Sequence, residues 1–248
     1  MAQKSEIEWT DGTWNPVTGC TKISLGCDNC YAETFAERFR GVSGHHFEHG
    51  FDLQLRPDRL AQPRTWKGRK VVFVNSMSDL FHKEIPLSYI DQVFDVMEEC
   101  SQHVFQILTK RSSLMRDYAK SRYSERKAPK HIWLGTTVEN AQAKSRIDNL
   151  RDTPAGIRFL SLEPLLGALG TLDLTDIDWA IVGGESGAKA RPMKEEWVSE
   201  ILSQCRDQGT HFFFKQWGRF SAEGKASSKK KNGRLFQGVE YNERPDFV

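Results

Sequence analysis

Short apolar runs alternate with segments of helical periodicity along most of this chain. Each run is rich in β-branched or aromatic residues and is followed by polar residues. The runs cover residues 70–75, 103–108, 131–135, 157–162, 178–182 and 211–214. Compact runs of this kind are typical of parallel strands that are buried on both faces. They therefore predict the strands of one sheet.

Helical spacing lies between these runs. Ile90, Val93, Phe94 and Met97 recur three or four residues apart and predict a helix that begins near Leu87. Similar spacing predicts helices over 112–120, up to 150 and over 194–206. A further strand is expected to end near 21–24, which gives about six to seven strands alternating with helices. Such alternation predicts a mostly parallel sheet with right-handed crossovers, in a barrel or an open α/β sheet.

Polar residues follow the predicted strands one after another. Because ligands gather at the carboxyl ends of parallel strands, we expect these side chains to share one mouth with the cysteine segment described next. The set is Asp79, Lys110, Thr136, Glu139, Asn140, Glu163, Glu185 and Lys215. Ordinary caps and turns are the alternative for any one of them; Glu139, for instance, would favour a helix N-terminus.

Three of the five cysteines stand in the spacing C-x6-C-x2-C, as Cys20, Cys27 and Cys30. Three thiolates can hold a 4Fe–4S cluster and leave one iron open, whereas full ligation takes four. A structural zinc site also usually has four ligands. Helical periodicity begins after Cys30, so the motif is expected on a loop that leads into a helix.

Other interpretations of the cysteines stay open at this point. Cys20, Cys27 and Cys30 would complete a zinc site with a histidine among His45, His46 and His49. A redox C-x-x-C pair leaves Cys20 unexplained. A disulfide framework is disfavoured, because the number of cysteines is odd and no secretory signal precedes them. Cys100 and Cys205 fall in helical patterns and are expected to be buried, inert thiols.

Length and charge refine this picture. The 248 residues suit one domain of the barrel class, and we predict a single domain over 1–248. Periodicity fades over 41–70, which is expected to be an elaborated surface insertion. Residues 219–248 form a C-terminal extension, in which the Ser- and Lys-rich stretch 221–231 is expected to be a flexible loop.

The formal net charge is only +2, but Lys and Arg concentrate over 53–70, 107–130 and 215–234. Such stretches either contact phosphates or form solvated surface. Aromatic residues among them, such as Trp66, Trp133 and Trp217, could stack on bases. The chain shows no secretory signal and no apolar run of the roughly 18 residues that span a bilayer. We therefore expect a cytoplasmic protein with no membrane partner.

The cysteine segment resembles that of radical S-adenosylmethionine (SAM) enzymes, whose usual spacing is C-x3-C-x2-C. The whole chain is similar to a phage-associated family of three-cysteine-motif proteins. Stretches 18–22, 76–81, 108–111, 161–165 and 183–187 carry this similarity. A more distant resemblance, to spore photoproduct lyase and its radical SAM relatives, rests on the cysteines and the strand order.

The resemblance implies a partial (β/α) barrel of the radical-SAM type. Cys20, Cys27 and Cys30 would bind three irons, and the fourth iron would chelate SAM. The implied SAM contacts are Ser76, Ser78 and Asp79 for the amino group, Thr136, Thr137, Glu139 and Asn140 for the ribose or carboxylate, and Gly183 and Gly184 for the adenine.

The implied chemistry is that of the cofactor. One electron, from a donor such as a flavodoxin-like protein, breaks a C–S bond of SAM, and a 5′-deoxyadenosyl radical abstracts hydrogen from the substrate. The predicted function is an iron–sulfur enzyme that acts on nucleic acid or a nucleotide. Its catalytic candidates are Lys110, Glu163, Glu185 and Lys215. The alternatives are a non-catalytic Fe–S or zinc nucleic-acid-binding protein and an Fe–S enzyme that does not use SAM.

Overall fold

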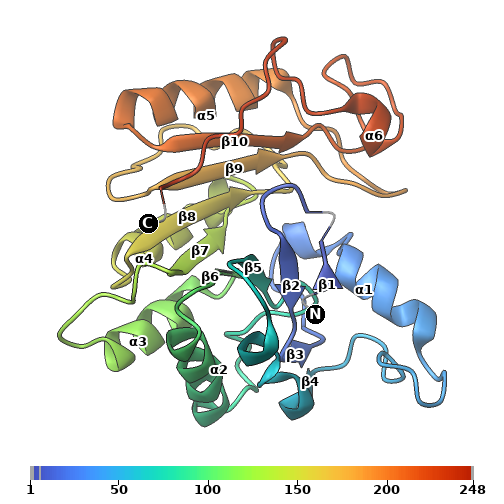
Figure 1. The fold of residues 1–248 in the computed structure, drawn as a ribbon. Coiled ribbons are helices and arrows are strands. Elements are labelled where there is room, and N and C mark those ends of the chain that lie inside the picture. Colours follow the sequence, from blue (N-terminus) through green and yellow to red (C-terminus); the bar gives the residue numbers. More distant parts are fainter. Residues whose placement is uncertain (1–2, 6, 247–248) are drawn as a thin grey trace.

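One curled sheet organises the protein, whose computed structural model describes residues 3–5 and 7–246 (Figure 1). The strand order is β1-β2-β5-β6-β7-β8-β9-β10, with every neighbouring pair from β2 to β10 parallel and β1 antiparallel to β2. The strands are β1 Gln3–Lys4, β2 Gly12–Trp14, β5 Val71–Val74, β6 Val104–Thr109, β7 Ile132–Thr137, β8 Ile157–Leu162, β9 Trp179–Gly183 and β10 His211–Gln216. The mostly parallel sheet predicted from the apolar runs is confirmed.

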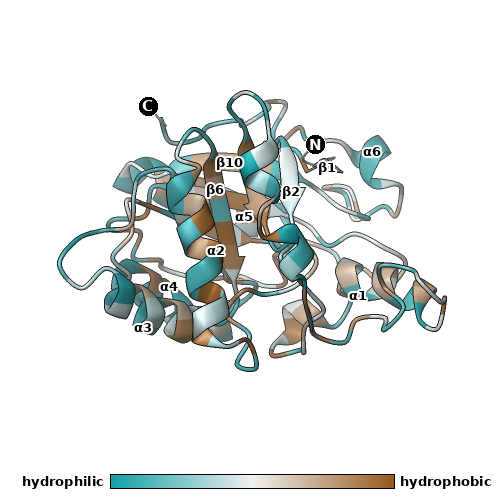
Figure 2. Ribbon diagram, turned by 60° about the horizontal axis from the view of Figure 1, so that its bottom comes forward, coloured by the Kyte–Doolittle hydropathy of each residue, from teal (hydrophilic) through white to brown (hydrophobic). Residues whose placement is uncertain are grey.

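Four helices cover the outer face of the curl (Figure 1). They are α2 Leu87–Glu99, α3 Ser112–Arg122, α4 Ser145–Arg151 and α5 Glu195–Gln208. Successive strand residues point to opposite faces of the sheet. In β5, Val72 and Val74 therefore join the large core beneath the helices, whereas Val71 and Phe73 join a second cluster inside the curl. Figure 2 shows apolar strands enclosed by helices with hydrophilic outer surfaces.

Aromatic side chains fill the inside of the curl. The Trp9 ring, contributed by the N-terminal segment, lies 4.8 Å from the Phe73 ring and 6.2 Å from the Trp179 ring between centroids. On β7, a Cβ at Gly135 would lie 2.5 Å from the Phe159 ring, so only glycine leaves room for that ring. The interior below the strand ends is therefore a packed aromatic layer.

The prediction of a strand that ends near 21–24 is wrong, because the structure has no strand there. The Ser24 carbonyl accepts the Cys27 N–H at 2.8 Å and closes a 3₁₀ turn, and the Thr21 carbonyl accepts a hydrogen bond from the Arg111 side chain. These groups are thus unavailable to a strand ladder. The strands before the cysteines are β2 and the short β3 Val17–Thr18. The helix expected after Cys30 is confirmed as α1 Tyr31–Ala36.

The 41–70 insertion carries regular structure. Its strand β4 Gln54–Leu55 pairs antiparallel with β3, and 3₁₀ turns cover Pro57–Arg59 and Gln62–Thr65. Arg40 binds both Glu37 and Asp52 and ties the insertion to the segment after α1. The predicted domain division comprises a single domain over 1–248, an insertion over 41–70 and an extension over 219–248. It includes residues outside the described part and stays a prediction.

The 221–231 stretch is folded against its neighbours. The Ser221 N–H donates to the Lys225 carbonyl at 3.0 Å, and Phe220 and Ala226 form an antiparallel bridge. The short helix α6 Lys229–Asn232 follows, with the Ser228 side chain as its N-cap. Within residues 3–5 and 7–246, no helix has the length and apolar character needed to cross a membrane.

Candidate active site

The three thiols predicted to act together line one cavity. It has a volume of about 440 Å³ and opens where the parallel strands end. Its wall includes Cys20, Cys27 and Cys30 together with strand-end residues predicted from the sequence: Ser76, Ser78, Asp79, Lys110, Thr137, Glu163, Gly184, Glu185 and Lys215. Thr136, Glu139, Asn140 and Gly183 lie outside this wall. The volume is in the range of small-molecule and cofactor sites.

The cavity has an apolar base and a polar rim. Ile7, Trp9, Phe73 and Leu108 contribute apolar surface from the aromatic layer inside the curl. The rim consists of the strand-end residues and the loop that carries the thiols. Apolar walls with a few convergent polar groups are typical of a ligand site.

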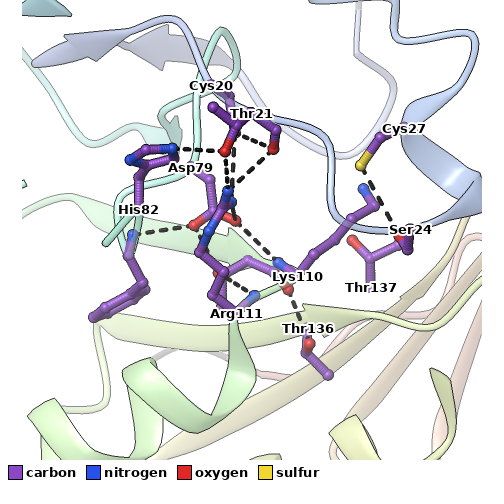
Figure 3. Close-up of polar contacts among 12 residues, drawn as sticks. Cys20, Thr21, Ser24, Cys27, Asp79, His82, Lys110, Arg111, Thr136 and Thr137 are labelled. Atoms are coloured by element: carbon purple, nitrogen blue, oxygen red, sulfur yellow. Dashed lines mark hydrogen bonds and ion pairs between the residues drawn. The ribbon is translucent and has the colours of Figure 1, made fainter. Parts of the chain in front are cut away.

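Arg111, at the start of α3, anchors the first part of the cysteine loop (Figure 3). Its guanidinium donates to the Thr21 carbonyl at 3.0 Å and to the Thr21 hydroxyl at 3.1 Å. It also lies 3.4 Å from the Cys20 sulfur. An ion pair with Asp79, at 2.9 Å, holds the guanidinium in place, and both side chains are only 9% exposed. Burial raises the pKa of Cys20, and Arg111 opposes that rise.

The Asp79 carboxylate is fully occupied by protein donors. It accepts hydrogen bonds from the Thr109 hydroxyl at 2.7 Å, the Phe81 N–H at 3.0 Å and the Lys110 N–H at 3.2 Å, besides Arg111. Asp79 thus joins the end of β5 to the end of β6. Ser76 and Ser78 are also engaged, with the Asn15 side chain and the Val17 carbonyl respectively.

Glu139, which follows β7, binds the middle of the cysteine loop. Its side chain is fully buried, pairs with Arg146 at 2.8 Å and accepts the Gly26 N–H at 3.4 Å. Burial raises the pKa of Glu139, but the Ser24 hydroxyl and Arg146 outweigh it and leave the pKa below its ordinary value. A Cβ at Gly26 would lie 3.2 Å from the Glu139 carboxyl carbon, so glycine permits this close approach.

Glu185 and Arg191, after β9, hold the last part of the loop. Arg191 pairs with Glu185 at 2.7 Å and donates to the Leu25 carbonyl at 2.9 Å. The Asn29 amide donates to Glu185 at 3.2 Å. Burial raises the pKa of Glu185, and the bonds from Arg191 and Asn29 bring it below its ordinary value. This catalytic candidate therefore contacts the loop that carries the thiols.

The other catalytic candidates face the cavity. The Lys215 ammonium lies 2.7 and 2.8 Å from the two Glu163 oxygens, and the Gln216 amide donates to Glu163 at 2.9 Å. The Lys110 side chain forms no hydrogen bond or ion pair with any residue in the described ranges, although its charge lowers the pKa of Glu139. Figure 3 shows the Lys110 side chain extending away from Asp79 toward Ser24.

Several predicted SAM contacts have structural roles in this chain. The Thr136 hydroxyl donates to the Thr109 carbonyl at 2.8 Å, and the Asn140 side chain caps the turn after β7. A Cβ at Gly184 would lie 2.0 Å from the Trp217 carbonyl oxygen, whereas one at Gly183 would lie 3.2 Å from the Glu163 carboxyl carbon. Gly184 therefore permits the close approach of two loops of this chain.

Sequence reasoning missed Asn75. This residue lines the cavity, is 2% exposed, and has both polar side-chain atoms without a partner among the described residues. Its φ of +61° is a left-handed conformation that Asn tolerates better than most residues. A polar residue directly after β5 was the available signal. Its amide therefore offers a donor and an acceptor to a molecule bound in the cavity.

The sequence predicts two alternative metal groups for these thiols, a single zinc ion and an iron–sulfur cluster. Among residues 3–5 and 7–246, no three His, Cys, Asp or Glu side chains group closely enough to hold one metal ion. A single zinc requires all its ligands within about 2.3 Å of one ion. The ring of His45 stacks on Phe39 at 3.9 Å, and His46 contacts Arg59, so these histidines have partners within the insertion. The zinc site proposed with them is not found.

A cluster places different demands on the same thiols. Its irons spread over several ångströms, so its ligands need to line one cavity rather than converge on a point. Cys20, Cys27 and Cys30 do so, beside the unpaired Asn75 amide. Cys100 and Cys205 are buried in the core as expected, and burial raises the pKa of Cys205 to about 12. The three thiols thus share one cavity, which is the observation that bears on a cluster.

The fold and the site define an α/β protein of the partial-barrel class with a three-thiol cavity at its mouth. The chain belongs to the family described as "Protein of unknown function (DUF5131)", which it matches over residues 4–245. None of the curated proteins compared with the chain matches it.

Solved structures of spore photoproduct lyase are similar to this chain. A mutant with bound AdoMet and dinucleoside spore photoproduct gives a TM-score of 0.50 at 11% identity, covering 84% of this chain and 64% of the lyase chain. A complex with the dinucleoside spore photoproduct gives 0.47 at 10% identity, with the same coverage. This chain thus spans less than two thirds of the lyase. The predicted fold class, a partial (β/α) barrel of the radical-SAM type, is confirmed.

Proposed function

We propose that this protein is an iron–sulfur enzyme that resembles radical SAM enzymes. Cys20, Cys27 and Cys30 would hold a 4Fe–4S cluster, with SAM at the open iron. One observation carries the proposal: the three thiols line a single cavity at the carboxyl ends of the strands of a partial barrel. Membership of the phage-associated three-cysteine-motif family is part of the same proposal.

The anchoring of the cysteine loop supports this function. Groups that follow β6, β7 and β9 bind it through Thr21, Gly26 and Leu25. Fixed ligands keep the geometry of a metal site, and their supporting hydrogen bonds tune it. When bound, a cluster with SAM supplies one-electron cleavage of a C–S bond of SAM and hydrogen abstraction from the substrate. The protein's part is to bind, to orient and to exclude water.

The residues of the cavity divide by what their side chains are free to do. The unpaired Asn75 amide, with Ser76 and Ser78, would meet the amino group of SAM, whereas Asp79 orients Arg111. Thr137 lines the cavity and would meet the ribose or carboxylate of SAM, and Gly184 would flank the adenine. Thr136, Glu139, Asn140 and Gly183 lie outside the wall and would support these residues rather than contact SAM.

Among the catalytic candidates, Lys110 is the cation with no ion pair among the described residues. Lys215 and Glu163 form a pair that can exchange a proton between the ammonium nitrogen and a carboxylate oxygen. Glu185 acts through the cysteine loop, so we assign it a positioning role.

Substrate and partners complete the proposal. The substrate is nucleic acid or a nucleotide; the basic stretches of the sequence and the dinucleoside in the lyase structures support it. The electron donor would be a flavodoxin-like protein, and the location cytoplasmic.

Anaerobic purification and reconstitution test the function. We expect roughly four irons per chain, a cluster spectrum that changes when SAM is added, and 5′-deoxyadenosine after reduction. Cys27→Ala should lose the cluster, and Cys100→Ala, a change at a buried thiol outside the cavity, should keep it. One zinc per chain and no response to SAM would indicate a binding module. A cluster without a SAM response would indicate an Fe–S enzyme that does not use SAM.

A further inference from the structure

A basic groove opens beside the cysteine cavity. Its volume is about 540 Å³, and it shares Thr21, Lys22, Lys110 and Arg111 with the wall of the cavity. Five of its lining residues are Lys or Arg, and none of them is Asp or Glu. Groove and cavity therefore adjoin, and the groove presents positive charge to whatever enters.

Part of this charge is not neutralised. Three of the cations pair with carboxylates outside the lining: Lys22 with Glu33, Arg111 with Asp79 and Arg146 with Glu139. Lys83 is exposed, and neither Lys83 nor Lys110 forms an ion pair within residues 3–5 and 7–246. The first turn of α3 also lines the groove, without an acidic residue or a side-chain cap. Its free N–H groups add to the attraction for an anion.

A second basic surface lies on the other side of the cavity. Lys229 of α6 lines the cavity wall and pairs with Glu8 at 2.8 Å. The next two residues, Lys230 and Lys231, are exposed and form no ion pair with a described residue. Lys225, in the turn before α6, is exposed too. The C-terminal extension thus carries exposed ammonium groups next in sequence to Lys229, a residue of the cavity wall.

The two surfaces lie far apart along the sheet. The groove adjoins the end of β6, whereas α6 follows the edge strand β10, and β7, β8 and β9 lie between them. Figure 1 shows α3 and α6 at opposite sides of the protein. One nucleotide needs a single phosphate site. Cations on both sides of a cavity instead match a chain of phosphates that crosses its mouth.

We infer that these two surfaces, which include Lys83 on one side and Lys230 and Lys231 on the other, bind the phosphodiester backbone of a single-stranded nucleic acid. One nucleotide of that nucleic acid then enters the cavity. This assignment rests on the proposed function and narrows its substrate from a nucleotide or nucleic acid to the polymer. A strand suits the site because enzymes that act on a base reach it only outside the stacked duplex.

Fluorescence anisotropy of labelled oligonucleotides tests the inference. The reconstituted protein is titrated, without reductant or SAM, into single-stranded DNA and RNA of about 12 nucleotides at several salt concentrations. Each phosphate contact with a single strand contributes about −0.7 to the slope of log K against log salt. Lys83→Gln combined with Lys230→Gln and Lys231→Gln should flatten the slope by about 2 and weaken binding at least tenfold.

A matched variant controls for net charge. Lys67, Lys127 and Lys130 are exposed and line neither the cavity nor the groove. Their triple change to Gln removes the same charge and should leave binding within about twofold. A nucleoside monophosphate should compete at least a hundredfold less well than the oligonucleotide. The DNA and RNA titrations distinguish the two polymers.

Several results would overturn the inference. These are equal weakening by both triple variants, equal competition by the mononucleotide, and no oligonucleotide binding at all. Loss of reduction by a flavodoxin-like protein, with normal oligonucleotide binding, would assign the lysines to the electron donor. The proposed function is judged by a separate measurement, because SAM cleavage is measured without any oligonucleotide. SAM cleavage without oligonucleotide binding would refute only this inference. Oligonucleotide binding without SAM cleavage would refute only the proposed enzymatic function.

Discussion

The sheet and the cysteine loop of this protein are held together in different ways. Strands β2 to β10 are joined by backbone ladders whose hydrogen bonds any sequence of suitable pattern can make. The loop over 20–30 instead depends on side chains from distant segments, chiefly Arg111, Glu139 and Arg191. The sheet therefore tolerates substitution of one apolar residue by another, whereas the loop depends on individual charged groups.

Arg111→Ala should break the loop's anchorage most strongly. It leaves Asp79 buried without its cation, which costs about 3–5 kcal/mol, and frees the Thr21 segment. Urea denaturation should show this loss, and iron content after reconstitution should fall. Asp79→Asn combined with Arg111→Met removes both charges and should recover much of the stability but not the iron. Equal stability of Arg111→Ala and the wild type would show that the loop is held by other contacts.

Gly184→Ala tests the mouth at the end of β9. The new Cβ would lie 2.0 Å from the Trp217 carbonyl oxygen, so backbone must move, at a cost of about 2–3 kcal/mol. Gly183→Ala is the matched control, because its Cβ would meet the Glu163 side chain at 3.2 Å and should cost about 1 kcal/mol or less. Thermal denaturation ranks the pair, and the reverse order would contradict the close packing of the two loops.

The 41–70 insertion, where His46 contacts Arg59, should make stability depend on pH. Burial, with Arg59 and Arg56 nearby, lowers the pKa of His46 to about 4 in the folded protein, against about 6.5 when unfolded. Between these values only the unfolded chain binds the proton, so this contribution, about 2 kcal/mol, is complete above pH 6.5 and is lost as the pH falls toward 4. Denaturation curves at several pH values should show the loss in the wild type. Its persistence in His46→Gln would assign it to another group.

Asn75→Ala should have the smallest effect on stability. Alanine is strained at φ +61°, which costs about 1 kcal/mol, whereas Asn75→Gly relieves the strain. Both variants lose the unpaired amide, so both should weaken SAM binding to the reconstituted protein, measured by calorimetry. A glycine variant that binds SAM as tightly as the wild type would remove Asn75 from the cofactor site.

The same contrast explains what could be predicted from the sequence. The apolar runs identified the parallel strands because burial of a strand leaves a local pattern. That sheet in turn brought Lys110, Glu163, Glu185 and Lys215 to one cavity. The strand near 21–24 was wrong because Ile23, the apolar residue in that stretch, is 45% exposed, and the backbone there bonds to a turn and to Arg111.

The partners within the site depend on tertiary structure. That Glu185 would bind Asn29 follows from the meeting of two segments more than 150 residues apart in the sequence, which no local pattern records. The unpaired Asn75 amide could not be predicted either, because satisfaction of a polar group depends on all its neighbours. Residue types at the strand ends thus predicted where the site lies, but not what each side chain does there.

The pairing of Glu8 with Lys229 has a consequence for biosynthesis. A ribosome makes residue 229 long after residue 8, yet the two side chains pair at the wall of the cavity to which Lys229 belongs. This pair therefore cannot form until α6 has been synthesised. The wall of the cavity is thus completed by contacts between segments that are far apart in the order of synthesis.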